Sequence, residues 1–273
     1  MAGLRECAAP ARRLISGAAA HKARHSMKTA IVIPARLGST RLPRKPLADI
    51  AGRAMILRVA DAAKAADIGP VLIAAGEEEI AEAARAAGYE AVLTDPDLPS
   101  GTDRVLAALQ AADPDRECEA VINLQGDLPD LDPAVIRAAL EAVTGAEGVD
   151  IGTLATENAD AAKRDDPNAV KAVLALEAGG RRGRALYFTR ATAPWGEGPI
   201  YKHVGIYAFR RAALERFCAL PPSPLEKRER LEQLRALENG MRIDALLIDD
   251  APDGVDTPED LERLRARLSA KET

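Results

Sequence analysis

The strongest constraint on the fold is an alternation of short apolar runs with helical patterns that begins at Thr29. Runs rich in β-branched residues predict strands at 29–34, 71–75, 91–94 and 121–124. Apolar residues recur at helical spacing between them and beyond, at 54–66, 77–87, 101–111 and from 133 onward. Strands joined through helices of this length form right-handed crossovers in a mostly parallel sheet. We therefore predict a doubly wound α/β layer for the first half of the chain.

The second half shows strand patterns with few helices between them. They lie at 151–156, 170–176, 184–188, 203–209 and 243–248. A charged amphipathic helix is predicted at 224–238 and a closing helix at 257–268, where Thr257 and Asp260 suit an N-terminal cap. We predict a mixed or antiparallel extension to the parallel sheet, and 28–273 as one domain.

The first 28 residues differ in charge from the rest of the chain. They carry a net charge of +5, whereas the whole chain carries −5, so the remainder carries −10. An Arg-rich, acid-poor leader has the composition of an organellar transit peptide, but we favour the simpler explanation that the start codon is assigned too far upstream of Met27. We exclude 1–27 from the predicted fold. The acidic remainder argues against nucleic acid as a partner.

The cysteines and the hydropathy exclude further classes of protein. Cys7, Cys118 and Cys218 form no CxxC pair, so neither a disulfide framework nor a zinc site is indicated, and a cytoplasmic location is expected. Apolar runs stay well short of the roughly 18 residues that a spanning helix needs. We expect no membrane insertion.

A basic loop follows the first predicted strand, at the carboxyl edge where parallel sheets bind ligands. Segment 34–47 contains Gly38, three arginines and Lys45. Backbone N–H groups and several cations suit a polyphosphate. The segment matches neither GxGxxG nor GxxxxGK[ST], so the dinucleotide and P-loop interpretations fail on spacing.

Two aspartates are candidate ligands for Mg²⁺. Asp127 ends the fourth strand in the same row as the basic loop, where it could hold the ion against phosphates or simply cap a turn before Pro129. Asp256 directly precedes the closing helix, a position where the helix dipole favours a carboxylate in any case. Taken alone, these residues leave both interpretations open.

The chain resembles the Kdo (3-deoxy-D-manno-octulosonate) cytidylyltransferases in seven ordered motifs that cover nearly all of 28–268. They are PARLGSTRLPRKPL at 34–47, SGTDR at 100–104, NLQGD at 123–127, ALYFTRATAPW at 185–195, HVGIYAF at 203–209, SPLEKRERLEQLR at 223–235 and GVDTPEDL at 254–261. The TRLPxKPL ending separates this group from the similar sialic-acid cytidylyltransferases. The resemblance implies transfer of CMP from CTP to Kdo, with release of pyrophosphate, for lipopolysaccharide biosynthesis, by a homodimer.

The resemblance also implies roles for individual residues around CTP. Arg36, Ser39 and Lys45 would hold the phosphates, and backbone at Ala35 would meet the cytidine. The nucleoside pocket would comprise Ser100, Gly101, Thr102 and Arg104, although Ser100 and Thr102 could cap the following helix at the same time. Mg²⁺ would be shared by Asp127 and Asp256, with a second Mg²⁺ on the outer phosphates. The catalytic set is then Asp127, Asp256, Lys45 and Arg36.

The sugar would be held by residues mostly of the extension: Gln125, Arg190, His203, Tyr207, Glu226 and Gln233. Arg190 is the best candidate for the Kdo carboxylate because a guanidinium can bind it through two hydrogen bonds. His203 could equally be an ordinary half-buried strand residue. We interpret Glu229, Glu232 and Arg235 as solvated charges on a helix face. In this scheme 28–150 is the nucleotide-binding half, 151–250 the sugar-binding and dimerisation extension, and 251–273 a closing metal-binding turn and helix.

Three positions depart from the family pattern. Leu128 stands where an acidic residue often follows QGD, and Arg44 stands where glycine is usual. Gly76 replaces the aspartate of a common Thr-Asp pair, which removes a carboxylate near the nucleotide. Two alternatives to a Kdo enzyme stay open: a cytidylyltransferase for a related acid sugar, and a nucleotide-binding regulator without catalysis.

Overall fold

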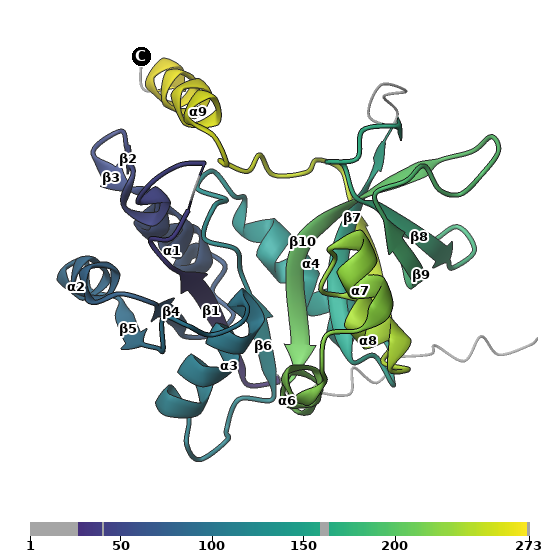
Figure 1. The fold of residues 1–273 in the computed structure, drawn as a ribbon, viewed down its shortest axis with the longest axis horizontal. Coiled ribbons are helices and arrows are strands. Elements are labelled where there is room, and N and C mark those ends of the chain that lie inside the picture. The colour runs from purple at the N-terminus through teal and green to yellow at the C-terminus, as the bar shows by residue number, and fades with distance from the viewer. Residues whose placement is uncertain (1–26, 40, 159–163, 272–273) are drawn as a thin grey trace, which may run out of the picture.

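The computed structural model describes residues 27–39, 41–158 and 164–271; of the leader predicted at 1–27, all but Met27 lies outside these residues. Strand β1 (Thr29–Ala35) lies between β4 (Val71–Ala75) and β6 (Ala120–Asn123), and β5 (Glu90–Leu93) pairs with β4. All three pairings are parallel, with Ile31 opposite Val71 on one side and Ile122 on the other. The predicted parallel layer is confirmed (Figure 1).

Helices cover both faces of this layer because successive side chains of a strand point to opposite faces. Ile31 and Ile33 belong to a core with helices α1 (Met55–Ala65), α2 (Glu78–Ala86) and α4 (Pro133–Thr144). Ala30 and Val32 belong to a second core with α3 (Gly101–Ala112) and α6 (Arg211–Ala219). A strand buried on both faces needs a continuous apolar run, which is what the sequence of β1 supplies.

The extension continues the same sheet. Its strands are β7 (Ile151–Asn158), β8 (Lys171–Leu176), β9 (Arg182–Thr189), β10 (Ile200–Arg210) and β11 (Ile243–Ile248). Within the described residues the strands lie in the order β5-β4-β1-β6-β10-β7-β11-β9-β8. Strand β10 runs antiparallel to both β6 and β7 and therefore joins the two halves (Figure 1).

The helix predicted at 224–238 is wrong. The segment forms two short helices, α7 (Pro224–Glu229) and α8 (Leu234–Glu238), because Arg230 adopts a left-handed conformation with φ of 56°. Helix α6 was absent from the predicted elements. Two short strands also follow the basic loop, β2 (Asp49–Ile50) and β3 (Arg53–Ala54).

The closing helix α9 (Pro258–Lys271) stands apart from the sheet at the end of segment 249–257, which is neither helix nor strand (Figure 1). Its predicted cap is confirmed, since the Asp260 N–H donates to Thr257 Oγ1 and the Thr257 N–H donates to Asp260 Oδ2. A small apolar cluster joins it to the segment after β1; its members are Leu42, Ile50, Met55, Val255, Leu261 and Leu264. Among the described helices, α9 included, none is both long enough and apolar enough to cross a membrane.

Candidate functional site

A polar pocket of about 430 Å³ lies at the carboxyl ends of the parallel strands. Ten of the predicted nucleotide, metal and sugar residues line it: Ala35, Arg36, Ser39, Lys45, Ser100, Gly101, Arg104, Gln125, Asp127 and Asp256. Segments far apart in the sequence meet here because the carboxyl ends of parallel strands share one edge of the sheet. The pocket therefore assembles most of the nucleotide and metal residues that the motifs predicted.

The basic loop is held in place at several points. Leu37 N–H donates to Glu77 Oε2 at 2.9 Å, and Leu42 N–H donates to Ser39 Oγ at 3.3 Å. Lys45 begins a 3₁₀ turn, Lys45–Leu47, directly after Arg44, which adopts a left-handed conformation with φ of 57°. A non-glycine residue is uncommon there, and the Arg44 guanidinium pairs with Glu79. Arg36, Ser39 and Lys45, in the described parts of this loop, line the pocket.

Lys45 lies between the two predicted metal ligands. Its Nζ is 2.9 Å from Asp127 Oδ2 and 2.8 Å from Asp256 Oδ1, and Arg41 is 3.3 Å from Asp256 Oδ2. The backbone joins the same segments, since Val255 N–H donates to Asp127 O at 3.0 Å. Burial opposes the charge on Lys45, but the attraction of the two carboxylates outweighs it and raises the pKa of the ammonium above its ordinary value.

The donor set fits a magnesium ion that is shared with a ligand. Throughout the described ranges, no group of three or more His, Cys, Asp or Glu side chains is arranged to hold a metal by itself. Mg²⁺ is commonly bound through one or two carboxylates together with phosphates of the substrate and water. Asp127 and Asp256 hold one cation between them, so their oxygens lie close enough together to share a metal ion in its place.

The wall beside the loop is built around Arg104. Ser100 caps α3 by accepting hydrogen bonds from the Thr102 and Asp103 N–H groups. The Arg104 side chain is buried, donates to Thr94 Oγ1 and Pro96 O, and has its pKa lowered by burial. Gly76 leaves the room that this guanidinium occupies, because a Cβ there would lie 3.0 Å from Arg104 Nη1.

Thr102 faces away from this pocket into a second group of polar side chains. It donates to Glu232 Oε2 at 2.7 Å and accepts from Asn123 Nδ2 at 3.1 Å. Asn123 in turn accepts from Gln125 Nε2 at 3.2 Å. Because Gln125 also lines the pocket, this chain of hydrogen bonds connects the carboxyl end of β6 to the segment between α7 and α8.

His203 and Tyr207 lie next to each other on β10, with ring centroids 5.5 Å apart. His203 Nε2 is 2.9 Å from Thr153 Oγ1, and its ring packs edge-on to Phe188. Burial lowers the pKa of His203 to about 3, so the imidazole is neutral near pH 7. Burial, and then the charge of Glu232, raise the pKa of Tyr207.

The other predicted sugar residues contact protein groups. Arg190 Nε donates to Glu229 O at 2.9 Å and Nη1 to Pro167 O at 3.0 Å. Glu226 pairs with Arg235 at 2.6 Å, and Gln233 is buried just before α8. The 430 Å³ pocket is not lined by these predicted sugar residues, Arg190, Glu226 and Gln233. The same holds for Thr102, His203 and Tyr207.

The interpretation of Glu229, Glu232 and Arg235 as solvated charges is wrong. Arg235 is buried against Glu226, Glu232 accepts from Thr102, and Glu229 accepts from Thr189 Oγ1 and the Arg190 N–H. Glu229 ends α7, whereas Glu232 and Arg235 follow the break at Arg230, which brings Arg235 back against Glu226. All three residues lie in the family motif at 223–235, and this position was the signal in the sequence that could have indicated a structural role.

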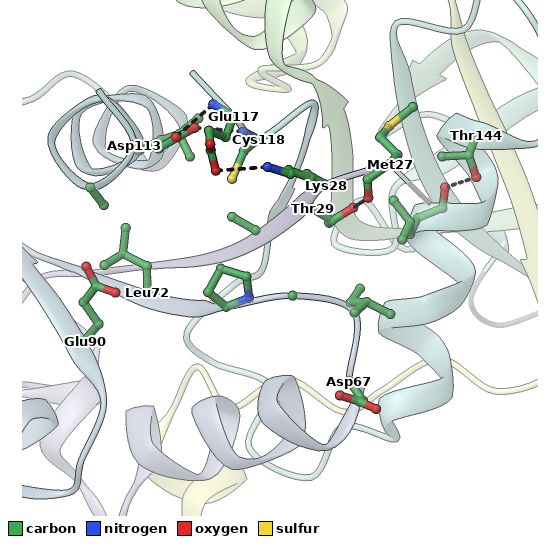
Figure 2. A pocket seen from close by; sticks show the side chains of 17 residues that line it. Met27, Lys28, Thr29, Asp67, Leu72, Glu90, Asp113, Glu117, Cys118 and Thr144 are labelled. Atoms are coloured by element: carbon green, nitrogen blue, oxygen red, sulfur yellow. Dashed lines mark hydrogen bonds and ion pairs between the residues drawn. The ribbon is translucent and has the colours of Figure 1, made fainter. Parts of the chain in front are cut away.

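A larger pocket of about 1010 Å³ opens at the amino ends of the same strands, lined partly by Met27, Thr29 and Leu72 (Figure 2). Lys28 there pairs with Glu117 at 3.1 Å. Asp113 accepts hydrogen bonds from the N–H groups of Glu117 and Cys118. Lys28, Asp113 and Glu117 thus have protein partners, whereas the predicted nucleotide and metal residues line the pocket at the opposite edge of the sheet.

Comparison with known proteins identifies the family of the chain. A family model described as cytidylyltransferase matches residues 30–243. The 3-deoxy-manno-octulosonate cytidylyltransferase of Parvibaculum lavamentivorans is 59% identical over 88% of this chain and 93% of its own length. The chain belongs to this cytidylyltransferase family. Another member, from Mesorhizobium japonicum, is 57% identical over 89% of this chain and 100% of its own length.

Solved structures place the fold within the same group. The cytidylyltransferase described as CMP:2-keto-3-deoxy-manno-octonic acid synthetase complexed with CTP has a TM-score of 0.81 at 37% identity, and the match covers 90% of this chain and 100% of that one. The 4-diphosphocytidyl-2C-methyl-D-erythritol synthase of Anaerococcus prevotii has a TM-score of 0.56 at 12% identity. The second likeness concerns the fold alone.

Proposed function

We propose that this cytidylyltransferase transfers CMP from CTP to the anomeric hydroxyl of Kdo and releases pyrophosphate. One observation carries the proposal: the cations of the basic loop and the carboxylates of Asp127 and Asp256 meet in one pocket at the carboxyl edge of the sheet. The structure that is similar to this chain at 37% identity is described as a complex with CTP. Relatives at 57–59% identity carry the Kdo name.

The proposed reaction is an in-line displacement at the α-phosphorus of CTP. The hydroxyl oxygen of Kdo forms a bond to that phosphorus, the bond to the bridging oxygen breaks, and the hydroxyl proton passes to solvent. Arg36 and Ser39 orient the triphosphate and Arg104 closes the nucleoside wall. Orientation and compensation of phosphate charge are the main contributions to rate in such transfers. No side-chain base is required of this chain.

Mg²⁺ is the proposed cofactor, with Asp127 and Asp256 as its protein ligands. When bound, the ion would polarise the α-phosphoryl oxygen and lower the pKa of the attacking hydroxyl. Two carboxylates from distant parts of the chain fix one position for it, because Val255 ties the segment before α9 to Asp127. The role of the protein is to hold these oxygens together at the edge of the pocket.

The sugar is proposed to lie between this pocket and the extension. Gln125 belongs to both regions, because it lines the pocket and donates to Asn123 in the hydrogen-bonded chain that ends at Glu232. His203 and Tyr207 supply a neutral aromatic surface there. In this arrangement Arg190 would exchange the carbonyl of Pro167 for the Kdo carboxylate.

A pyrophosphate-release assay with CTP, Mg²⁺ and a panel of acid sugars tests the proposal. We expect release with Kdo well above that with 8-amino-Kdo or a nonulosonic acid. Faster release with another sugar would replace Kdo as the proposed substrate. CTP binding without pyrophosphate release for any sugar would favour a nucleotide-binding regulator without catalysis.

A homodimer is proposed on the basis of two exposed apolar side chains of the extension, Leu186 at 55% and Trp195 at 99% exposure. Burial of large apolar side chains that otherwise face water favours association with a partner. Sedimentation should find a dimer that Leu186→Arg with Trp195→Arg dissociates. Leu93→Arg, on β5, should leave the dimer intact. If the double variant and Leu93→Arg had the same oligomeric state, the proposed dimer surface would be contradicted. A cytoplasmic location and a role in lipopolysaccharide synthesis accompany the proposed activity.

A further inference from the structure

The Lys45 ammonium occupies the gap between the carboxylates proposed to hold Mg²⁺. It lies within 2.9 Å of Asp127 Oδ2 and 2.8 Å of Asp256 Oδ1, and its side chain is only 14% exposed. Arg41 adds a second cation, 3.3 Å from Asp256. The two negative and two positive charges in this group cancel. Two carboxylates this close to one cation would repel each other without it.

A divalent cation that binds these oxygens meets two obstacles. The ammonium already uses one oxygen of each carboxylate, and two cations cannot share one gap without strong repulsion. Replacement of Lys45 by a divalent cation would also add positive charge to a group whose charges now cancel. A triphosphate removes both obstacles, since it offers the ammonium an anionic partner and balances the added charge.

We propose that Lys45 makes divalent-cation binding conditional on the nucleotide: its ammonium holds Asp127 and Asp256 together until a triphosphate draws it away. This inference rests on the proposed function of the pocket. It extends the phosphate-binding role of Lys45 to a second one, that of a counter-ion in the absence of ligand.

The local structure allows the side chain to move while the backbone stays in place. The left-handed turn at Arg44 and the buried ring of Pro46 fix the backbone on both sides of Lys45. Arg36 and Ser39, which line the same pocket, lie where the phosphates would bind. A lysine carries a compact ammonium on a flexible stem of four carbons. Its charged end can therefore move from one anion to a neighbouring one while the backbone stays in place.

Binding of Mn²⁺, followed by the electron paramagnetic resonance of the free ion, tests the proposal with and without CTP. Because CTP chelates Mn²⁺ by itself, binding to the protein is the loss of signal beyond that seen with CTP alone. If CTP changes the affinity of the protein for Mn²⁺, binding of the two ligands is coupled. The ratio of the Mn²⁺ affinities with and without CTP measures this coupling. For the wild-type protein we expect weak binding alone and strong binding with CTP. Lys45→Met should bind Mn²⁺ alone at least tenfold more tightly than wild type, with a correspondingly smaller ratio. Lys45→Arg keeps the charge and should retain the wild-type ratio.

Control variants separate the two proposals. Lys28→Met removes a lysine from the opposite edge of the sheet and should change neither affinity. If Asp127→Asn binds Mn²⁺ with CTP as well as wild type does, the proposed metal site fails. If Asp127→Asn loses that binding but Lys45→Met binds Mn²⁺ alone no more tightly than wild type, only the role of Lys45 is overturned.

Thermal unfolding supplies a second readout in case Lys45→Met is poorly folded at the temperature of the binding assay. Without its counter-ion the variant should melt below wild type. Mn²⁺ without CTP should then raise its Tm more than that of wild type. Equal Mn²⁺-induced shifts in the two proteins would contradict the proposal.

Discussion

Gly76 stands where any side chain would collide with the guanidinium of Arg104. The sequence alone indicated only that a carboxylate is missing near the nucleotide. The structure adds that the vacated space is filled, because Arg104 lies against Gly76 while it donates to Thr94 and Pro96. The departure at one residue is thus connected to the position of another in the nucleoside wall.

A methyl group at position 76 should therefore weaken CTP binding. In Gly76→Ala the new Cβ would lie 3.0 Å from Arg104 Nη1 and 3.3 Å from Arg36 Cβ, so both side chains must shift. We expect a loss of about tenfold in CTP affinity, about 1.4 kcal/mol, measured by calorimetry. Gly205→Ala is the control, since nothing lies within 4 Å of its added Cβ. Unchanged CTP affinity in Gly76→Ala would contradict the role of Arg104.

His203 should contribute to the pH dependence of stability. Its pKa is about 3 in the folded protein and ordinarily near 6.5, so the unfolded chain binds the extra proton between these values. The contribution is complete above about pH 6.5 and is lost as the pH falls, by at most about 1.4 kcal/mol per pH unit. Urea unfolding of wild type and His203→Asn from pH 7 to 4 should show the steeper loss in wild type. Parallel curves would contradict a half-buried imidazole that stays neutral in the folded protein.

At the scale of elements, the break between α7 and α8 decides which side chains face inward. A helical pattern across 224–238 could be predicted from the sequence, but the left-handed residue at Arg230 could not, because arginine is not a residue that favours this conformation. For that reason the ion pair of Arg235 with Glu226 and the contact of Glu232 with Thr102 were missed. Both depend on the turn rather than on helical spacing.

Loss of one partner of the Arg235–Glu226 pair should strongly destabilise the protein. Arg235 is 6% exposed and also packs over the Phe217 ring. Arg235→Met leaves the Glu226 carboxylate with little water and no cation, which costs about 3–5 kcal/mol of unfolding free energy. Arg263→Met, at a pair whose arginine side chain is 71% exposed, should cost about 0–1 kcal/mol. Chemical denaturation measures both, and similar small losses would contradict the buried pair.

At the scale of the whole molecule, the parallel half was predictable and the joining of the two halves was not. Local periodicity predicts the four parallel strands and the helices that follow them, although not the short β2 and β3, and right-handed crossovers make those four strands parallel. The insertion of β10 between β6 and β7 depends on pairing between distant segments, which periodicity does not reveal. The same contrast applies to the two aspartates. Asp127 follows from its place at a strand end, whereas Asp256 reaches the pocket because Val255 before α9 and Leu261 within it pack against the segment after β1.

The most direct test of the central claim is pyrophosphate release from CTP, Kdo and Mg²⁺ by wild type, Asp127→Asn and Asp256→Asn. Both aspartates lie at the pocket edge and are partly exposed, so the variants should fold, as circular dichroism can verify. We predict a loss of at least about a thousandfold in kcat for each, as expected for loss of charge stabilisation in the transition state. Near-normal turnover in either folded variant would contradict a site in which two carboxylates share one metal ion.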